Sequence, residues 1–301
     1  MRAMSSVLTL VGNPTARDLS AAQVEAVTDA LSATGARVHH YDWLAPQLAV
    51  DILFHRLGRE AATEAAAAAL AGAPVDLAVQ EVESRRKRLL IADMDSTIVT
   101  GETLDELAAE AGIREEVAAI TRRTMLGELP FEESLRARVA LLRDLKLHAL
   151  DEVVRRLTLS PGAHSLVRSL RAHGCYTVLC SGGFTFCTEP VAELCGFHEH
   201  HANVLLHADG RLTGKVAEPV LGRRAKVERL HQVLKERHLK PDQAAAVGDG
   251  ANDIDMLQEV GLGVAYRGKP AVREATPYRI DHSDLTALLY FQGLRELELV
   301  V

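Results

Sequence analysis

Along residues 6–82, short runs in which polar and apolar positions alternate are separated by longer amphipathic stretches. In the first amphipathic stretch Val24, Val27 and Leu31 recur at three- and four-residue spacing, which places them on one face of a helix. The pattern predicts strand, helix, strand, strand, helix and strand, at 7–12, 20–35, 36–44, 48–57, 59–73 and 75–82. This βαββαβ order is typical of a split βαβ unit of the α+β class, the ferredoxin-like arrangement.

The pattern changes at Leu89, where a continuous apolar run leads to Asp93. Such a run is expected of a central parallel strand that is covered on both faces. Four helical stretches follow, at 104–112, 114–127, 130–145 and 150–159. Strands and helices then alternate to residue 291, with one hairpin at 201–218 that turns at Asp209-Gly210.

Alternating strands and helices indicate a doubly wound, Rossmann-like α/β fold with a parallel sheet. The four helical stretches, at about 102–160, interrupt this alternation, so we interpret them as an inserted helical-bundle cap. Two domains are expected, a βαββαβ unit at 1–84 and a larger α/β domain at 85–301. The basic run at 85–88 is best explained as a solvated linker between them.

Composition narrows the class of function. Apolar residues make up 48% of the 301 positions and aromatic residues only 4%, which suits an aliphatic core of helices packed on a sheet. The formal charge of −7 offers no basic surplus for nucleic acid or anionic lipid, but it permits a locally positive phosphate pocket. No stretch matches a signal peptide or a membrane span, so we expect a cytoplasmic protein without nucleic-acid or membrane partners.

Cysteines and histidines suggest other sites, which we consider weaker. The cysteines lie in one short stretch without CxxC spacing, so free thiols are expected rather than disulfides or a zinc site. They are Cys175, Cys180, Cys187 and Cys195. A histidine group matches no zinc motif and is expected to flank a strand at the surface. It consists of His198, His200, His201 and His207.

Two carboxylates end the first strand of the larger domain. Asp93 and Asp95 are two residues apart, so an extended backbone points both into one crevice at the carboxyl end of the sheet. Carboxylates this close repel each other unless one takes up a proton or a cation lies between them. Mg²⁺ is the natural cation because it prefers oxygen ligands. Taken alone, residues 95–97 can equally cap a helix.

Two further strand ends favour the chemical interpretation. Ser181, Gly182 and Gly183 end a second apolar strand, and their hydroxyl and amide groups suit phosphate oxygens. Lys226 lies on a helix before the third strand, where its ammonium can reach an anion. The third strand end supplies Asp249, Asn252 and Asp253. Acid, hydroxyl-glycine and acid at three strand ends, with one lysine, together indicate a phosphate-handling site.

These motifs, DMDST at 93–97, SGG at 181–183, Lys226 and GDGAND at 248–253, resemble those of the haloacid dehalogenase superfamily of aspartyl-phosphate phosphatases. The resemblance covers about residues 89–295 and includes a helical cap between the first two motifs. Within the superfamily, DMDSTIVTGETLDELA and TMLGELPFEESLRARVALL are similar to the phosphoserine phosphatase family. The resemblance implies a Mg²⁺-dependent enzyme that hydrolyses phosphoserine, a small molecule, in the last step of serine biosynthesis.

The resemblance also implies roles for the motif residues. Asp93 would attack phosphorus and form an aspartyl-phosphate, while Asp95 would protonate the leaving oxygen and later activate water. The ligands of Mg²⁺ would be Asp93, the backbone carbonyl of Asp95, and Asp249. The phosphoryl group would be bound by Ser181, Gly182, Gly183 and Lys226. The surroundings of the metal and the lysine would be completed by Asn252, a substrate-binding residue, and by Asp253, which supports them without binding the metal directly.

Substrate selection would come from the cap. Arg138 matches a position that would bind the carboxylate of phosphoserine, and Glu102 one that would bind its ammonium group. Met125 and Phe131 match apolar positions that would shield the site from water. Gly101 and Gly127 would serve as hinges.

Each cap residue also has a plainer explanation. Arg138 can pair along its helix with Glu133 or Ser134, Glu102 can be an ordinary first-turn acid, and the two apolar side chains can belong to the core. The motif context favours the substrate roles for Glu102 and Arg138.

The N-terminal unit resembles an ACT-type amino-acid-sensing domain. Its loop after the first strand, GNPTARDLS, departs from the glycine and acidic residues that the family usually has there, so a homodimer contact is favoured over serine binding. Two rival functions stay open. One is a related enzyme that acts on another phosphate ester or transfers the phosphoryl group. The other is a non-catalytic sensor, against which the complete motif set argues.

Overall fold

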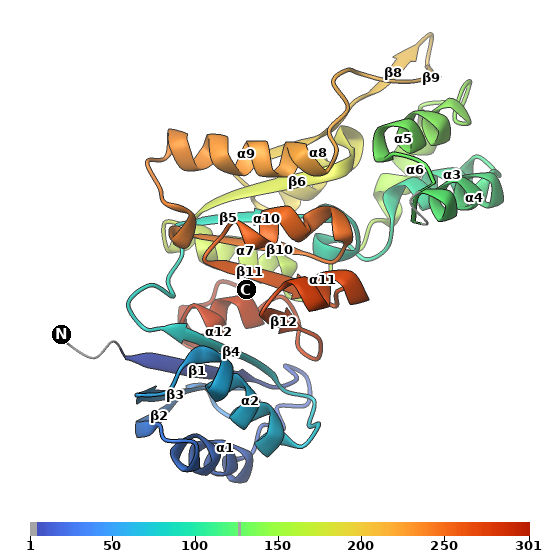
Figure 1. Ribbon diagram of the computed structural model, residues 1–301. Helices are drawn as coiled ribbons and strands as arrows, with labels where there is room; N and C mark the ends of the chain where they lie inside the picture. Colours follow the sequence, from blue (N-terminus) through green and yellow to red (C-terminus); the bar gives the residue numbers. More distant parts are fainter. Residues whose placement is uncertain (1–4, 126–127) are drawn as a thin grey trace.

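The computed structural model describes residues 5–125 and 128–301 and contains two main sheets (Figure 1). The first is antiparallel, with the strand order β2-β3-β1-β4. Its elements are β1 (Ser6–Val11), α1 (Ala21–Ala33), β2 (Arg37–Ala45), β3 (Ala49–His55), α2 (Arg59–Leu70) and β4 (Asp76–Glu81). The βαββαβ order predicted from the sequence is confirmed.

Both helices of this unit cover one face of its sheet. Helix α1 begins at Ser20, whose side chain accepts a hydrogen bond from the backbone N–H of Gln23 while the Gln23 side chain accepts one from the backbone N–H of Ser20, a reciprocal capping box. The apolar stripe of α1 and the Ala62, Ala66 and Leu70 face of α2 pack on the inward-facing strand residues. This unit therefore has its own small core.

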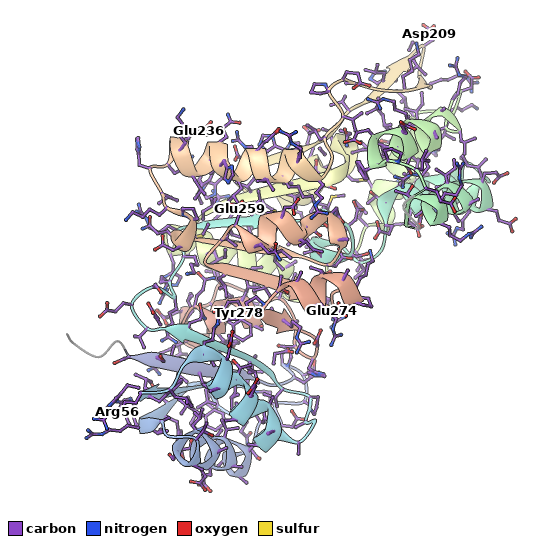
Figure 2. The ribbon with its side chains drawn as sticks, viewed as in Figure 1. Arg56, Asp209, Glu236, Glu259, Glu274 and Tyr278 are labelled. Carbon is purple, nitrogen blue, oxygen red and sulfur yellow. The ribbon has the colours of Figure 1, made fainter. Side chains whose placement is uncertain are left out.

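The opposite face of the antiparallel sheet packs on the rest of the chain. Helix α12 (Ala287–Phe291) is buried along its whole length because it lies between the two main sheets and contacts β1 and β4. The hydroxyl of Tyr278 donates to the carbonyl of Val79 at 3.0 Å, and the Gln80 amide donates to the carbonyl of Phe291 at 2.7 Å. Figure 2 shows Tyr278 at this junction.

The second sheet has six parallel strands in the order β12-β11-β10-β5-β6-β7. The strands are β5 (Leu89–Ala92), β6 (Tyr176–Phe184), β7 (Glu199–Asn203), β10 (Ala244–Gly248), β11 (Leu262–Tyr266) and β12 (Tyr278–Ile280). The helices of this part are α7 (Ala163–Ala172), α8 (Thr185–Cys195), α9 (Arg223–Glu236), α10 (Ile254–Gln258) and α11 (Pro270–Ala275). In β5, Leu89 and Ile91 face α9 and α10, whereas Leu90 and Ala92 belong to the core on the other face. Helices thus cover both faces, which explains the continuous apolar run.

The predicted hairpin at 201–218 needs a correction. Its first residues belong to β7, the sixth strand of the parallel sheet, and only β8 (Leu205–Ala208) and β9 (Arg211–Val216) form the antiparallel pair. The turn at Asp209-Gly210 is as predicted, and Figure 2 shows Asp209 at the tip of the hairpin. Polar side chains on β7 made it resemble a hairpin strand, since an edge strand of the sheet need not be wholly apolar.

Four helices form the cap that the sequence predicts, α3 (Thr103–Glu110), α4 (Arg114–Met125), α5 (Phe131–Ala140) and α6 (His148–Arg156). The chain enters and leaves the cap through adjacent segments, because Val99 and Leu159 form an antiparallel bridge. The β8–β9 hairpin lies beside the cap (Figure 1) and bonds to the α5–α6 connection. The backbone N–H of Asp144 donates to the carbonyl of Leu212 at 2.9 Å, and that of Leu212 donates to the carbonyl of Leu145 at 2.9 Å.

The four cysteines are buried free thiols, as predicted. Within the described residues, every helix is too short or too polar to cross a membrane.

Candidate active site

One cavity of about 140 Å³ lies at the carboxyl end of the parallel sheet. Asp93 follows β5, Ser181 lies in the last part of β6, and Asp249 follows β10. Because neighbouring parallel strands end at the same edge, these side chains meet although they are far apart in the sequence. The cavity also brings in cap residues, so that sheet and cap line one space.

Asp93 is the most deeply placed acid of the cavity, with 4% of its surface exposed. The Lys226 ammonium donates to Asp93 Oδ1 and also to Asp253 Oδ1, the latter at 2.6 Å. Burial raises the pKa of Asp93 well above its usual value, and the nearby carboxylate of Asp253 raises it further. Burial alone would lower the pKa of Lys226, but the carboxylates of Asp253 and Asp93 raise it overall, so this lysine stays charged.

Asp95 is held between the sheet and the cap. Its Oδ1 accepts a hydrogen bond at 2.8 Å from the backbone N–H of Thr103, the first residue of α3, and its Oδ2 accepts one at 3.2 Å from the Ser181 hydroxyl. Burial raises the pKa of Asp95 despite these hydrogen bonds. A side chain at Gly183 would place its Cβ 2.8 Å from Asp95 Oδ2, so glycine is required there. The carboxyl group is thus fixed in place and favours retention of a proton.

The SGG segment is anchored by a residue that sequence reasoning missed. The Gly183 amide donates to the Ser181 hydroxyl at 2.8 Å. Asn203, at the end of β7, donates from its side-chain amide to the carbonyl of Gly182 at 2.9 Å and to that of Leu221 at 3.1 Å, and it accepts from the Leu221 N–H at 2.7 Å. Nothing around Asn203 in the sequence signals this role, since it depends on two distant loops.

Three carboxylates lie close enough to hold a metal ion. One oxygen from each of Asp93, Asp249 and Asp253 falls within 4.8 Å of the others. Burial raises the pKa of Asp249, as it does for Asp93, although Lys269 and Lys226 each act in the opposite direction. Asp93 and Asp253 both bind Lys226, but Asp253 also accepts hydrogen bonds from the Gly250 N–H at 3.0 Å and from the Asn252 amide at 3.3 Å. Of the three acids, Asp253 therefore has its oxygens most fully occupied by protein donors.

The cap places Glu102, Phe131 and Arg138 on the same cavity. Glu102 accepts a hydrogen bond at 3.0 Å from the Ser96 hydroxyl, and burial raises its pKa. The plainer explanation for Arg138 holds in part, because its Nε donates to the carbonyl of Ser134 at 3.3 Å, but its side chain also lines the cavity. Burial lowers the pKa of Arg138, which faces no direct carboxylate partner within the described chain.

Four further predicted residues have different outcomes. Asn252 lines the cavity and donates to Asp253 Oδ1 at 3.3 Å. Met125 closes α4, but its side chain is outside what the structure describes, and Gly127 lies outside the described residues. Gly101 has a φ of +86°, which suits glycine, next to the segment that enters the cap.

Lys269 is a second residue that the sequence interpretation missed. It follows β11 and lines the cavity, with its Nζ 3.0 Å from Asp249 Oδ2 and 3.6 Å from Glu102 Oε1. The strand-end argument that found Asp93 would also have found Lys269, but a lone lysine before a proline carries no motif of its own.

The histidine group makes local contacts instead. The ring of His198 accepts a hydrogen bond at 3.1 Å from the backbone N–H of Thr177, and that of His200 pairs with the Thr188 hydroxyl at 2.9 Å. Among the residues described, the only group with metal-ligand spacing is the aspartate set in the cavity.

Comparison with known proteins gives the family. The model of the haloacid dehalogenase-like hydrolases matches residues 90–258, more than half of the chain. The chain belongs to the haloacid dehalogenase-like hydrolase family. Within that family, a phosphoserine phosphatase of Streptomyces coelicolor is 37% identical over 297 residues, which are 97% of this chain and 72% of the relative. The protein is thus a phosphatase, as the sequence motifs predict.

Solved structures agree with this haloacid dehalogenase-like assignment. A phospho-aspartyl intermediate analogue of phosphoserine phosphatase is 40% identical, with a TM-score of 0.64 over 68% of this chain and 99% of that one. A probable phosphoserine phosphatase from Vibrio cholerae, in an unliganded form, is 28% identical, with a TM-score of 0.77 over 99% of this chain and 88% of that one. The second match extends over the antiparallel sheet as well as the hydrolase core.

Proposed function

We propose that the protein hydrolyses phosphoserine to serine and phosphate in a Mg²⁺-dependent reaction, as the last step of serine biosynthesis. The observation that carries the proposal is one cavity that holds Asp93 and Ser181 from the sheet together with Glu102 and Arg138 from the cap. Phosphoserine carries a phosphate, a carboxylate and an ammonium group, and the cavity offers a matching group for each. The names of the relatives and solved structures support the same substrate.

In this proposal Asp93 is the nucleophile. One of its carboxylate oxygens forms a bond to phosphorus while the bond from phosphorus to the serine oxygen breaks, which leaves an aspartyl-phosphate. The second step adds water to phosphorus and restores the free carboxylate. Lys226, pinned by Asp253, stays charged and binds phosphoryl oxygens together with the Ser181 hydroxyl and the amides of Gly182 and Gly183.

Asp95 moves the proton in both steps. Its raised pKa favours the protonated form, which donates to the departing serine oxygen. The resulting carboxylate then takes a proton from the attacking water. The hydrogen bond from the Thr103 N–H sets the orientation of this carboxyl group, so the start of the cap helix α3 helps to aim the proton donor.

Asp93, the backbone carbonyl of Asp95, and Asp249 would hold Mg²⁺, with Asn252 and Asp253 beside them. When bound, the ion offsets the repulsion between the carboxylates and the phosphate and stabilises charge on the phosphoryl group. Arg138 binds the substrate carboxylate, Glu102 its ammonium, and Phe131 keeps water from the closed cavity. Met125 and the hinge glycines Gly101 and Gly127 complete the proposed cap.

The proposal is tested by phosphate release from phosphoserine, phosphothreonine and an aryl phosphate, with and without Mg²⁺. Arg138→Ala should lower kcat/KM for phosphoserine about 100-fold, the effect of losing a charged hydrogen bond, and should spare the aryl phosphate. Arg136→Ala is the matched control. Arg136 lies on the same helix as Arg138, but it is exposed and pairs with the exposed Glu218. Equal losses on both substrates in Arg138→Ala would contradict recognition of the carboxylate.

We also propose that the chain divides into domains at 1–84 and 85–301 and that the N-terminal unit forms a homodimer contact. The separate core of that unit supports the division. The homodimer contact is supported by strand β2. This strand lies at an edge of the antiparallel sheet, and most residues in its first half are exposed, so it could pair with a second copy of the chain. Sedimentation of the full chain should give twice the monomer mass, and a monomer at all concentrations would contradict the contact.

A further inference from the structure

Lys269 occupies a position in the cavity that the proposed reaction leaves without a role. Its backbone N–H donates to the backbone carbonyl of Asp249 at 2.9 Å, which fixes the start of its side chain. Its ammonium then reaches Asp249 Oδ2 at 3.0 Å and Glu102 Oε1 at 3.6 Å. The side chain is 51% exposed, so it can move into solvent without breaking a packed core.

The two lysines at this edge of the sheet are held very differently. Lys226 is 2% exposed and is committed to Asp93 and Asp253. Lys269 is half exposed and contacts Asp249 through Oδ2, one of the two oxygens that this carboxylate can offer a metal ion. An ammonium and a divalent cation that share one carboxylate group repel each other strongly at this separation.

We propose that Lys269 is a tethered cation that a metal ion displaces from Asp249, and that it thereby sets the metal affinity of the site. Part of the free energy of metal binding is spent on breaking this ion pair. Glu102 reinforces the pair, because it attracts the same ammonium from the cap side. The inference rests on the proposed metal role of Asp249, but it does not depend on the identity of the phosphate ester.

Three substitutions separate displacement from a general effect of charge. Lys269→Gln removes the ammonium that contacts Asp249 and keeps the backbone hydrogen bond. Arg138→Gln is the matched control, since it removes one positive charge that lines the same cavity but makes no ion pair with Asp249. Lys269→Arg keeps a cation at the mouth of the cavity.

The test is titration of the full-length, metal-free protein with MgCl₂ by calorimetry, without any phosphate ester. Lys269→Gln should bind Mg²⁺ about fivefold more tightly, the upper range for a partly exposed ion pair, while Arg138→Gln should change the affinity less than about twofold. Lys269→Arg should stay near wild type. Unchanged or weaker binding in Lys269→Gln, or equal gains in Lys269→Gln and Arg138→Gln, would overturn the proposal.

Thermal unfolding gives a second test, in which Lys269→Gln should change the melting temperature in opposite directions without and with Mg²⁺. Without metal, Lys269→Gln should melt at or slightly below the temperature of wild type, because it loses an ion pair. With Mg²⁺ at a concentration near the wild-type Kd, its melting temperature should rise more than that of wild type, because tighter binding stabilises the folded state more. A smaller rise would count against displacement. Neither measurement uses turnover. If the protein failed to hydrolyse phosphoserine, the displacement of Lys269 could still be demonstrated, and if displacement failed, the proposed hydrolysis would be unaffected.

Discussion

Buried carboxylates occur in two regions of the molecule, and the two regions treat them differently. At the junction between the sheets, Asp76 accepts hydrogen bonds from the backbone N–H groups of Asp281 at 2.8 Å and Ser283 at 2.7 Å, and from that of His282 at 3.2 Å. Asp51 nearby accepts from the Thr9 hydroxyl and from Arg85, each at 2.6 Å. At the active site, Asp93 and Asp253 share one lysine, and Asp249 has a partner that is half exposed.

The difference shows which acids support the fold and which serve the chemistry. The junction acids are each satisfied by donors of their own, so they join the antiparallel unit to the hydrolase core. The active-site acids repel one another and face a cavity, so they are incomplete without a cation or a substrate. An accumulation of buried acids with too few partners is thus the physical signature of the site, independent of any motif.

Asp93→Asn should give the largest effect. Phosphoserine turnover should fall at least about a thousandfold, because the nucleophile is lost. The metal-free variant should nevertheless melt at or above the temperature of wild type near neutral pH, since the raised pKa of Asp93 shows that its charged form is disfavoured in the fold. Phosphate release and calorimetric melting check both parts. Activity that survived the change would place the nucleophile elsewhere.

Asp76→Ala should show the opposite behaviour. The backbone N–H groups of residues 281–283 would lose their acceptor, which should lower the free energy of unfolding by about 3 kcal/mol. The value of kcat should change less than about twofold, because Asp76 lies in the junction and not in the active site. Urea unfolding followed by circular dichroism measures the loss, and Asp76→Asn, which keeps one acceptor, should lose less. A large fall in kcat with unchanged stability would break the comparison.

The pH dependence of stability tests the active-site acids through a comparison with Asp93→Asn, because burial also raises the pKa of the junction acids Asp51 and Asp76. Asp93, Asp95 and Asp249 have pKa values raised mainly by burial, so they contribute stability that is fully present below the unfolded pKa, about 4, and is lost as the pH rises through their folded values. Consider the free energy of unfolding of the metal-free wild-type protein minus that of metal-free Asp93→Asn. This difference should be largest at low pH and should decrease as the pH rises. Saturating Mg²⁺ should reduce this trend. A difference between the two proteins that stays constant with pH would contradict it.

Gly222→Ala should have the smallest effect. Phe131 packs on Gly182 and Gly222, and a Cβ at Gly222 would lie 3.2 Å from Phe131 Cδ1 and 3.1 Å from Glu132 Oε1. The cap would then close less well, which should lower kcat/KM about threefold to tenfold. Gly58→Ala is the matched control, because Gly58 also precedes a helix but has open space around it. Equal changes in the two variants would rule out a cap effect.

Sequence patterns predict most of the fold and part of the site. The periodicity of apolar residues predicts both the βαββαβ unit and the parallel sheet, because helices and strands each require a characteristic spacing of apolar residues along the chain. Strand-end chemistry brings Asp93, Ser181 and Asp249 together, and the structure places all three on one cavity. Asn203 is missed because its partners lie in loops whose approach depends on tertiary packing. Lys269 is missed because a lone lysine after a strand carries no motif, although it contacts Asp249.

Because the β8–β9 hairpin contacts the cap, the cap helices by themselves do not form a unit that could be moved to another protein. Residues 102–160 alone are not a portable lid, since the α5–α6 connection shares backbone hydrogen bonds with Leu212 and Arg136 pairs with Glu218 beyond the hairpin. Grafting this lid onto another hydrolase core would require two separate insertions of matched length. A chimaera that carried only the helices would leave their connection without its backbone partners.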